Sequence, residues 1–196
     1  MKWMIASDLH GSGYYCEMLF KKYEEGGYDK LLLLGDLLYH GPRNDLPKGY
    51  RPQAVISMLN EHSKDIIWIE GNCDAAVDQM VLDIPMVRDF MIIVWNDQLI
   101  YATHGHKFGE FHPITKEDHL MLCGHTHVPK CRFFDHYVYL NPGSVSLPKE
   151  GFENSYMTME GDTLTWHGLL TDKIHRTESL DQLILEMHQL ADKTDH

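Results

Sequence analysis

The hydrophobic pattern of the first third of the chain predicts strands that alternate with helices. Continuous apolar runs of strand length, typical of strands covered on both faces, lie at 4–6, 30–34 and 66–69. Apolar residues at helical spacing predict helices over 15–25, 52–59 and 75–82. This order implies parallel strands joined by right-handed crossovers.

The second half of the chain favours hairpins. Apolar runs separated by short polar turns pair 91–95 with 99–103, 132–134 with 137–140, and 156–159 with 164–167, and 120–123 is a further short strand. Crossover units followed by hairpins predict an α/β fold in which two sheets pack face to face with helices outside. No repeat, low-complexity segment or linker interrupts the pattern, so we expect a single domain over 1–196.

A helical extension is expected at about 179–192, where apolar residues form one stripe opposite acidic and polar residues. Two interpretations of this stripe remain open. It packs on the parent sandwich, or it contacts another subunit and makes the protein a homo-oligomer.

Composition limits the classes of partner. The net charge of −12, with no lysine- and arginine-rich block, argues against nucleic acid or an anionic membrane as the primary partner. The longest apolar runs are strand-sized, and the N-terminus does not resemble a signal peptide. The four cysteines form no Cys-x-x-Cys pair, which is typical of reduced thiols in a cytoplasmic protein.

Side chains that bind metals follow five of the predicted strands. The motifs are Asp8-x-His10, Gly35-Asp36, Gly71-Asn72-Cys73-Asp74, His104-Gly105-His106 and Gly124-His125-Thr126-His127. Open α/β sheets bind ligands just outside the carboxyl ends of their strands, so we expect the five motifs to form one site. Glycine beside each ligand allows sharp turns and close approach.

The ligand types indicate which ions the site would hold. The candidates are Asp8, His10, Asp36, Asn72, His104, His125 and His127. Carboxylate, imidazole and amide groups suit divalent manganese, iron or zinc. Seven ligands exceed the need of one ion, whereas two ions bridged by one carboxylate use them all. Such a pair polarises a phosphoryl oxygen and makes a metal-bound hydroxide available for in-line attack.

The motifs resemble those of the calcineurin-like metallophosphoesterase superfamily. Together with Gly41-Pro42-Arg43-Asn44 and Asn141-Pro142-Gly143-Ser144, they are most similar to the small phosphodiesterases of the YfcE type, over the chain to about residue 170. The resemblance implies a four-layer α/β/β/α sandwich of two mixed β-sheets and a small phosphodiester substrate. It also implies two divalent ions, with manganese the usual activating ion and zinc, iron or nickel as alternatives.

The resemblance also implies a role for each ligand. Asp8, His10, Asp36 and His127 would hold the first ion, and Asp36 would bridge to a second ion held by Asn72, His104 and His125. Asp36, Asn72 and His104 would thus be catalytic. Asp74 would orient its neighbours, cap the following helix, or do both.

One residue departs from the superfamily pattern. Cys73 stands where many members carry a histidine that contacts the phosphate or protonates the leaving oxygen. A thiol performs either task poorly, so Cys73 favours diesters over monoesters. His40 or His106 would fill the gap, or each is an ordinary loop histidine.

Arg43 and Asn44 are further candidates for substrate binding beside Cys73. An arginine fork suits phosphate oxygens, although Arg43 would equally stitch its own loop. Asn141-Pro142-Gly143-Ser144 fits a plain turn.

Two other functions use the same fold. The eukaryotic retromer scaffold subunit resembles it but serves as a protein-binding platform, and a scaffold tolerates lost ligands, whereas all seven positions are filled here. A nuclease would share the metal chemistry, but the sequence lacks a basic groove. The sequence therefore favours an enzyme, a metal-dependent phosphodiesterase, over a scaffold.

Overall fold

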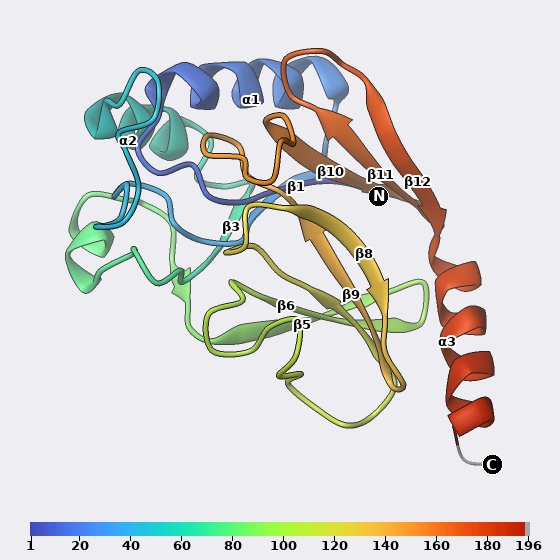
Figure 1. Cartoon of the computed structure of the whole chain (residues 1–196). Coiled ribbons are helices and arrows are strands. Elements are labelled where there is room, and N and C mark those ends of the chain that lie inside the picture. Colours follow the sequence, from blue (N-terminus) through green and yellow to red (C-terminus); the bar gives the residue numbers. More distant parts are fainter. Residues whose placement is uncertain (195–196) are drawn as a thin grey trace.

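The computed structural model describes residues 1–194, with side chains through residue 191, so residues 195 and 196 of the predicted domain lie outside the described part. Two mixed sheets face each other (Figure 1). The first sheet has the order β12-β11-β10-β1-β2-β3-β4 and the second has the order β5-β6-β7-β9-β8. The predicted α/β sandwich of two mixed sheets is confirmed.

The first sheet contains the predicted crossover units. Its parallel strands are β1 (Lys2–Ala6), β2 (Lys30–Leu33), β3 (Ile66–Ile69) and the two-residue β4 (Met86–Val87). Helix α1 (Gly13–Gly26) connects β1 to β2, and helix α2 (Pro52–Glu61) connects β2 to β3. The Ser12 hydroxyl caps α1 by accepting from the Tyr15 amide at 3.3 Å, and Gly27 ends it in the left-handed region at φ 63°.

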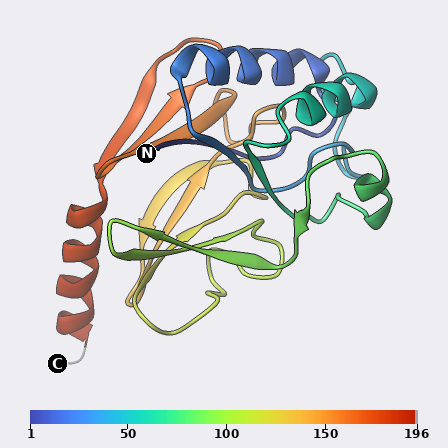
Figure 2. The ribbon, with the colours of Figure 1, turned by 180° about the vertical axis from the view of Figure 1, so that it is seen from behind.

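Strand alternation divides the interior into two cores. Met4 and Leu31 face α1 and α2, which cover the outer side of the first sheet, as both views show (Figures 1 and 2). Ile5 and Leu32 point the other way, into the core between the sheets. Both faces of β1 and β2 are thus buried, which explains why these strands are continuously apolar.

The remaining strands confirm the three predicted hairpins. They are β5 (Phe90–Trp95) with β6 (Gln98–Thr103), β8 (Pro129–Phe133) with β9 (Tyr137–Pro142), and β10 (Ser155–Glu160) with β11 (Thr163–Gly168). Strand β7 (His119–Leu122) lies between β6 and β9 and is parallel to both. The carboxyl ends of β6 and β7 therefore point in the same direction.

Two short segments differ from the expected helices. The short helix predicted over 75–82 is a 3₁₀ helix, η1, that spans only Ala76–Met80. The outer face of the second sheet is covered by irregular chain over 104–118, where Phe108 packs against the buried Tyr139 and its neighbours. Two glycines and Pro113 in this segment oppose a helix, so no helical layer forms there within the described residues.

The C-terminal region adds an edge strand and a helix to the sandwich. Strand β12 (Ile174–Ser179) was not predicted, because its side chains are largely exposed and show no apolar alternation. Helix α3 (Leu180–Thr194) inserts Leu180, Leu183 and Met187 into the core between the sheets. The stripe on α3 therefore packs on the parent sandwich. No helix within the described chain is long and apolar enough to cross a membrane.

Candidate metal centre

The five predicted motifs meet at one edge of the sandwich. Strands β1, β2 and β3 of the first sheet and β6 and β7 of the second all end there. The backbone links these strand ends directly: the Asp8 amide donates to the Gly35 carbonyl at 3.1 Å, and the Gly124 amide donates to the His104 carbonyl at 2.8 Å. The topology thus brings ligands more than 100 residues apart in sequence into one cluster.

Asp8, His10 and His127 form one half of the cluster. The Nε2 atoms of His10 and His127 lie 3.3 Å apart, and the Asp8 Oδ1 atom lies 3.3 Å from Nε2 of His127 and 3.6 Å from Nε2 of His10. All three side chains are buried. Asp8 Oδ1 makes no hydrogen bond in the described structure. A buried carboxylate oxygen without a donor is costly unless a cation binds it.

Hydrogen bonds to carbonyl groups set the tautomer of these histidines. Nδ1 of His10 lies 2.8 Å from the Tyr39 carbonyl, and Nδ1 of His127 lies 2.6 Å from the Leu147 carbonyl. A carbonyl only accepts, so each Nδ1 carries the proton and each Nε2 presents a lone pair to the site. The same arrangement orients metal-binding histidines generally.

Charge effects favour a cation at this point. Burial would raise the pKa of Asp8, but the His10 and His127 imidazoles beside its Oδ1 atom outweigh burial and hold that pKa well below its usual value. Burial would lower the pKa of His10, but the nearby Asp8 and Asp36 carboxylates raise it. Both shifts show that the surroundings stabilise positive charge between these groups.

Asp36, His104 and Asn72 form the other half. Asp36 Oδ2 lies 3.7 Å from Nε2 of His10 and 3.5 Å from Nε2 of His104, so this one oxygen faces both halves. Nδ1 of His104 donates to the Leu34 carbonyl at 2.6 Å, which leaves its Nε2 as an acceptor. That Nε2 atom faces Oδ1 of Asn72, another acceptor, at 3.0 Å. Two acceptors at this distance also call for a cation.

His125 lies beside the second half but makes no ligand contact there in the described structure. Its ring packs edge-on against His104, with ring centroids 5.1 Å apart, and it lines the pocket above the cluster. Burial and the nearby His104 lower the pKa of His125 to about 4, so its imidazole is neutral near pH 7. Its role as a ligand stays a prediction.

The backbone at the strand ends is strained. Five of the candidate ligands are non-glycine residues in the left-handed region: Asp8, His10, Asp36, His125 and His127, with φ between 46° and 66°. Such conformations cost free energy and cluster at functional sites. This backbone strain is not visible in the hydrophobic pattern or in the motifs.

Asp74 holds the ends of β2 and β3 together. Its carboxylate accepts from the amides of Asp36 at 2.9 Å, Leu37 at 2.8 Å and Gly71 at 2.7 Å, and from the Trp68 indole at 3.1 Å. These contacts agree with the predicted orienting role. The side chain that accepts at the start of η1 is Asp78, which bonds the Ala75 amide at 2.8 Å.

Gly71 is required by this packing. A Cβ at that position would overlap the carboxylate of Asp36, whose Oδ1 accepts from the Cys73 amide at 2.8 Å. The Gly71 to Asp74 turn thus wraps closely around the carboxylate that faces both halves of the cluster.

The end of β9 and the turn after it support the site, although the sequence predicts only a plain turn there. The buried Asn141 amide donates to the Gly124 carbonyl at 2.7 Å and to Thr126 Oγ1 at 3.1 Å, which holds the turn that carries His125. Ser144 and Ser146 both donate to the Asp8 carbonyl, at 3.0 and 2.9 Å. A polar Asn-x-x-Ser run that follows a fully buried strand was the available signal.

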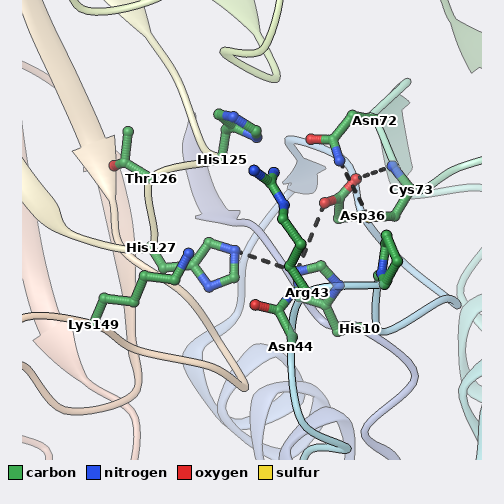
Figure 3. Close-up of a pocket in the computed structure, with 12 residues that line it drawn as sticks. His10, Asp36, Arg43, Asn44, Asn72, Cys73, His125, Thr126, His127 and Lys149 are labelled. Carbon is green, nitrogen blue, oxygen red and sulfur yellow. Dashed lines mark hydrogen bonds and ion pairs between the residues drawn. The ribbon is translucent and has the colours of Figure 1, made fainter.

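A pocket of about 450 Å³ opens over the cluster (Figure 3). Among the residues that line it are three predicted for substrate binding, Arg43, Asn44 and Cys73, and one that was not predicted, Lys149. The Asn44 amide donates to the His40 carbonyl at 2.8 Å and so also braces its own loop. Burial and the nearby Asp36 raise the pKa of the Cys73 thiol to about 12, so Cys73 is a neutral thiol. His40 and His106 do not line the pocket.

The residues present fit a binuclear metal site. Three groups of side chains offer ligand atoms within 4.8 Å of one another: Asp8, His10 and His127; His10, Asp36 and Cys73; and Asp8, Asp36 and His104. Any two of these groups have one residue in common, which is Asp8, His10 or Asp36, so the three groups form one continuous cluster. Acceptors that face each other, an unpartnered carboxylate oxygen and hard-to-borderline donor atoms all suit divalent cations.

Fold and site define the class of protein. Residues 1–164 match the family model described as the calcineurin-like phosphoesterase superfamily domain, and the chain belongs to this superfamily.

Curated relatives give the particular resemblance. The chain is 41% identical to phosphodiesterase YfcE of Escherichia coli (strain K12) over 166 residues, which cover 84% of this chain and 90% of YfcE. It is 25% identical over 178 residues to the probable metallophosphoesterase YsnB of Bacillus subtilis (strain 168), covering 84% and 88%.

Solved structures agree with this placement. The structure of the E. coli phosphoesterase YfcE superposes with a TM-score of 0.88 at 38% identity, covering 92% of this chain and all of that one. Vacuolar protein sorting 29 from Cryptosporidium parvum shares the fold alone, with a TM-score of 0.59 at 15% identity over 91% and 97% of the two chains.

Proposed function

We propose that this chain hydrolyses small phosphodiesters at a site that holds two divalent metal ions, with the Asp36 carboxylate shared between them. By its relation to YfcE it is a phosphoric diester hydrolase. The observation that carries the proposal for the site is the single Asp36 oxygen that faces acceptor atoms of both halves, His10 Nε2 and His104 Nε2.

The proposed ligands are those predicted from the sequence. Asp8, His10, Asp36 and His127 would hold the first ion, and Asp36, Asn72, His104 and His125 the second. Bound ions would polarise the phosphoryl oxygens and supply a water-derived nucleophile near neutral pH. The ligand set accommodates several divalent metals. We propose to test manganese first, because it is the usual activating ion of the phosphodiesterases that this chain resembles.

The protein's own groups would prepare the site and orient the substrate. Carbonyl groups fix His10, His104 and His127 with their Nε2 atoms inward. Asp74 fixes the turn around Asp36. Arg43 lines the pocket and would bind non-bridging phosphate oxygens through its planar fork.

Cys73 supports diesters rather than monoesters as substrates. Its thiol is neutral, with a pKa of about 12, and lies against the Asn72 amide at 3.2 Å. It therefore offers neither the positive charge that a dianionic monoester needs nor an efficient proton donor for a poor leaving group.

An enzyme is favoured over a protein-binding scaffold. The candidate ligands are complete, and six of the seven side chains contact one another at 3.0–3.7 Å. A scaffold would gain nothing from keeping facing acceptors buried, because their desolvation is costly without a cation.

The test is hydrolysis of bis(p-nitrophenyl) phosphate by the purified protein with manganese, with and without chelator. We expect turnover that chelator abolishes and added manganese restores. The Asp36→Ala variant should fall by at least about a hundredfold, since one substitution removes a ligand from both halves. Metal-independent turnover, or an unimpaired Asp36→Ala variant, would refute the proposed site. No turnover by folded, metal-loaded protein would favour the scaffold.

The cellular compartment of the protein stays a proposal. All four cysteines are free thiols, which supports a reducing compartment such as the cytoplasm. A single-domain organisation and a homo-oligomer also stay predictions.

A further inference from the structure

Two cations line the pocket without a carboxylate partner. Arg43 and Lys149 are both exposed, and neither makes an ion pair with any residue that the structure describes. Elsewhere on this acidic chain, cations are commonly paired: Lys130 and Arg132 both contact Glu110, for example, at 2.9 Å. Unpaired cations at a pocket in a chain of net charge −12 indicate that the pocket accepts anionic groups.

The backbone of Lys149 is fixed beside a proposed metal ligand. Its amide donates to the His127 carbonyl at 3.2 Å, and the His127 ring donates to the carbonyl of Leu147, two residues before Lys149. The Phe152 amide then closes a turn onto the Lys149 carbonyl at 3.1 Å. The loop that presents the ammonium group is thus anchored to His127 at two points.

Lys149 and Arg43 approach the pocket from different sides. Arg43 lies in the loop after β2, where Gly41 packs so closely on Cys73 that an added Cβ would lie 3.0 Å from the thiol. Lys149 lies in the loop after β9, attached to His127. Both side chains extend toward the middle of the pocket (Figure 3). Arg43 therefore serves the Asp36 side of the cluster, and Lys149 serves the His127 side.

The pocket has room for more than a phosphate group. A volume of about 450 Å³ is typical of sites that enclose a whole small molecule, so an ester group of the substrate would lie in the pocket as well. The phosphate under attack would already meet the metal centre and Arg43. Lys149 is a second, separate cation, and it would best bind a second anionic group of the substrate.

We infer that Lys149 determines specificity by binding an anionic group carried on the ester portion of the substrate, beyond the phosphorus under attack. This inference rests on the proposed phosphodiesterase function and names its substrate class: phosphodiesters that carry a further phosphate or carboxylate. Lys149 binds this group in the ground state and the transition state alike, so it lowers KM and leaves kcat unchanged.

The test uses two substrates with the same leaving group. Thymidine 5′-(p-nitrophenyl phosphate) carries one negative charge, and its 3′-phosphorylated form carries an additional phosphate. For the Lys149→Met variant we expect KM for the 3′-phosphorylated form to rise about fivefold, the upper range for an exposed ion pair, and kcat to stay unchanged. KM for the singly charged substrate should change less than about twofold. High salt should remove the difference between wild type and variant.

Control variants separate recognition from structure. Lys149→Arg should restore most of the affinity. Lys64→Met should behave as wild type, because Lys64 is exposed and makes no ion pair with any described residue. It lies just before β3, at the amino end of that strand, whereas the site lies at the carboxyl ends. Metal content and thermal unfolding should be the same for all variants. As a readout without turnover, calorimetry should show weaker binding of thymidine 3′,5′-bisphosphate, but not of thymidine 5′-phosphate, to Lys149→Met.

Each outcome decides the inference. Equal loss for both substrates, no loss for either, or loss of metal from Lys149→Met would overturn it. Turnover of the singly charged substrate by wild type tests the proposed function by itself, so failure of that function is distinguishable from failure of the assignment to Lys149.

Discussion

The buried cluster and the exposed rim of the same pocket differ in how they are held. Asp8 and His104 are fully buried, and backbone carbonyl groups or amides occupy the side of each ligand that faces away from the site. Arg43 and Lys149 are exposed, and only the backbone of their loops is fixed. The cluster is therefore built to hold charge in one geometry, whereas the rim is built to select among ligands.

Among substitutions outside the proposed ligand set, the largest effect should come from Asp74, which contacts the candidate ligand Asp36 through its backbone amide. Asp74→Asn keeps the volume but replaces an acceptor that serves several N–H donors with an amide that itself donates. We expect metal affinity and kcat to fall about tenfold to a hundredfold, as for other supporting residues of metal sites. Metal titration and turnover measure this.

The matched control is Asp78→Asn, four residues further on. Asp78 accepts only at the start of η1, so its replacement should leave turnover near wild type. Similar losses in both variants would mean that the turn as a whole, rather than the Asp74 carboxylate, supports the cluster.

A smaller effect is expected at the boundary between cluster and rim. Cys73→His would place an imidazole where the neutral thiol now lies beside Asp36, and a protonated imidazole would bind a dianion and donate a proton. The ratio of monoester to diester hydrolysis should rise about tenfold. Rates on p-nitrophenyl phosphate and its bis ester measure it, with Cys73→Ser as the control. An unchanged ratio would show that Cys73 does not set this preference.

The smallest effect on turnover should come from the far end of the sandwich. Leu183 on α3 is 1% exposed within the core between the sheets, so Leu183→Ala should lower the free energy of unfolding by about 3 kcal/mol. Activity per folded molecule should not change. Leu185 on the same helix is 51% exposed, and Leu185→Ala should stay within about 0.5 kcal/mol of wild type. Equal stabilities of the two variants in urea would show that α3 is not part of the core.

The strand ends could be predicted from the sequence, because the apolar run and the ligand residue that follows it are both local signals. A run such as Lys30 to Leu34 is apolar on both faces, and the ligand follows within two residues. Parallel strands then bring separate ligands to one edge without further information. That is why most of the cluster could be predicted before its geometry was known.

The supporting residues could not be predicted in this way. Asn141 and Lys149 act through contacts with residues 15 to 22 positions away, and these contacts exist only once the loops have closed. Strand β12 was missed because its pairing with β11 is made by the backbone while its side chains remain exposed. Resemblance also suggested a helical outer layer where Gly105, Gly109 and Pro113 impose irregular chain.

The left-handed conformation of the five strand-end ligands sets stability and function against each other. Glycine adopts positive φ without a steric penalty, so at Asp8, His10, Asp36, His125 or His127 it would relieve backbone strain. The same exchange would delete a proposed metal ligand. Selection for thermal stability alone would therefore favour replacement of these strand-end residues. A thermostable variant that keeps its activity needs its stabilising substitutions at positions away from the strand ends.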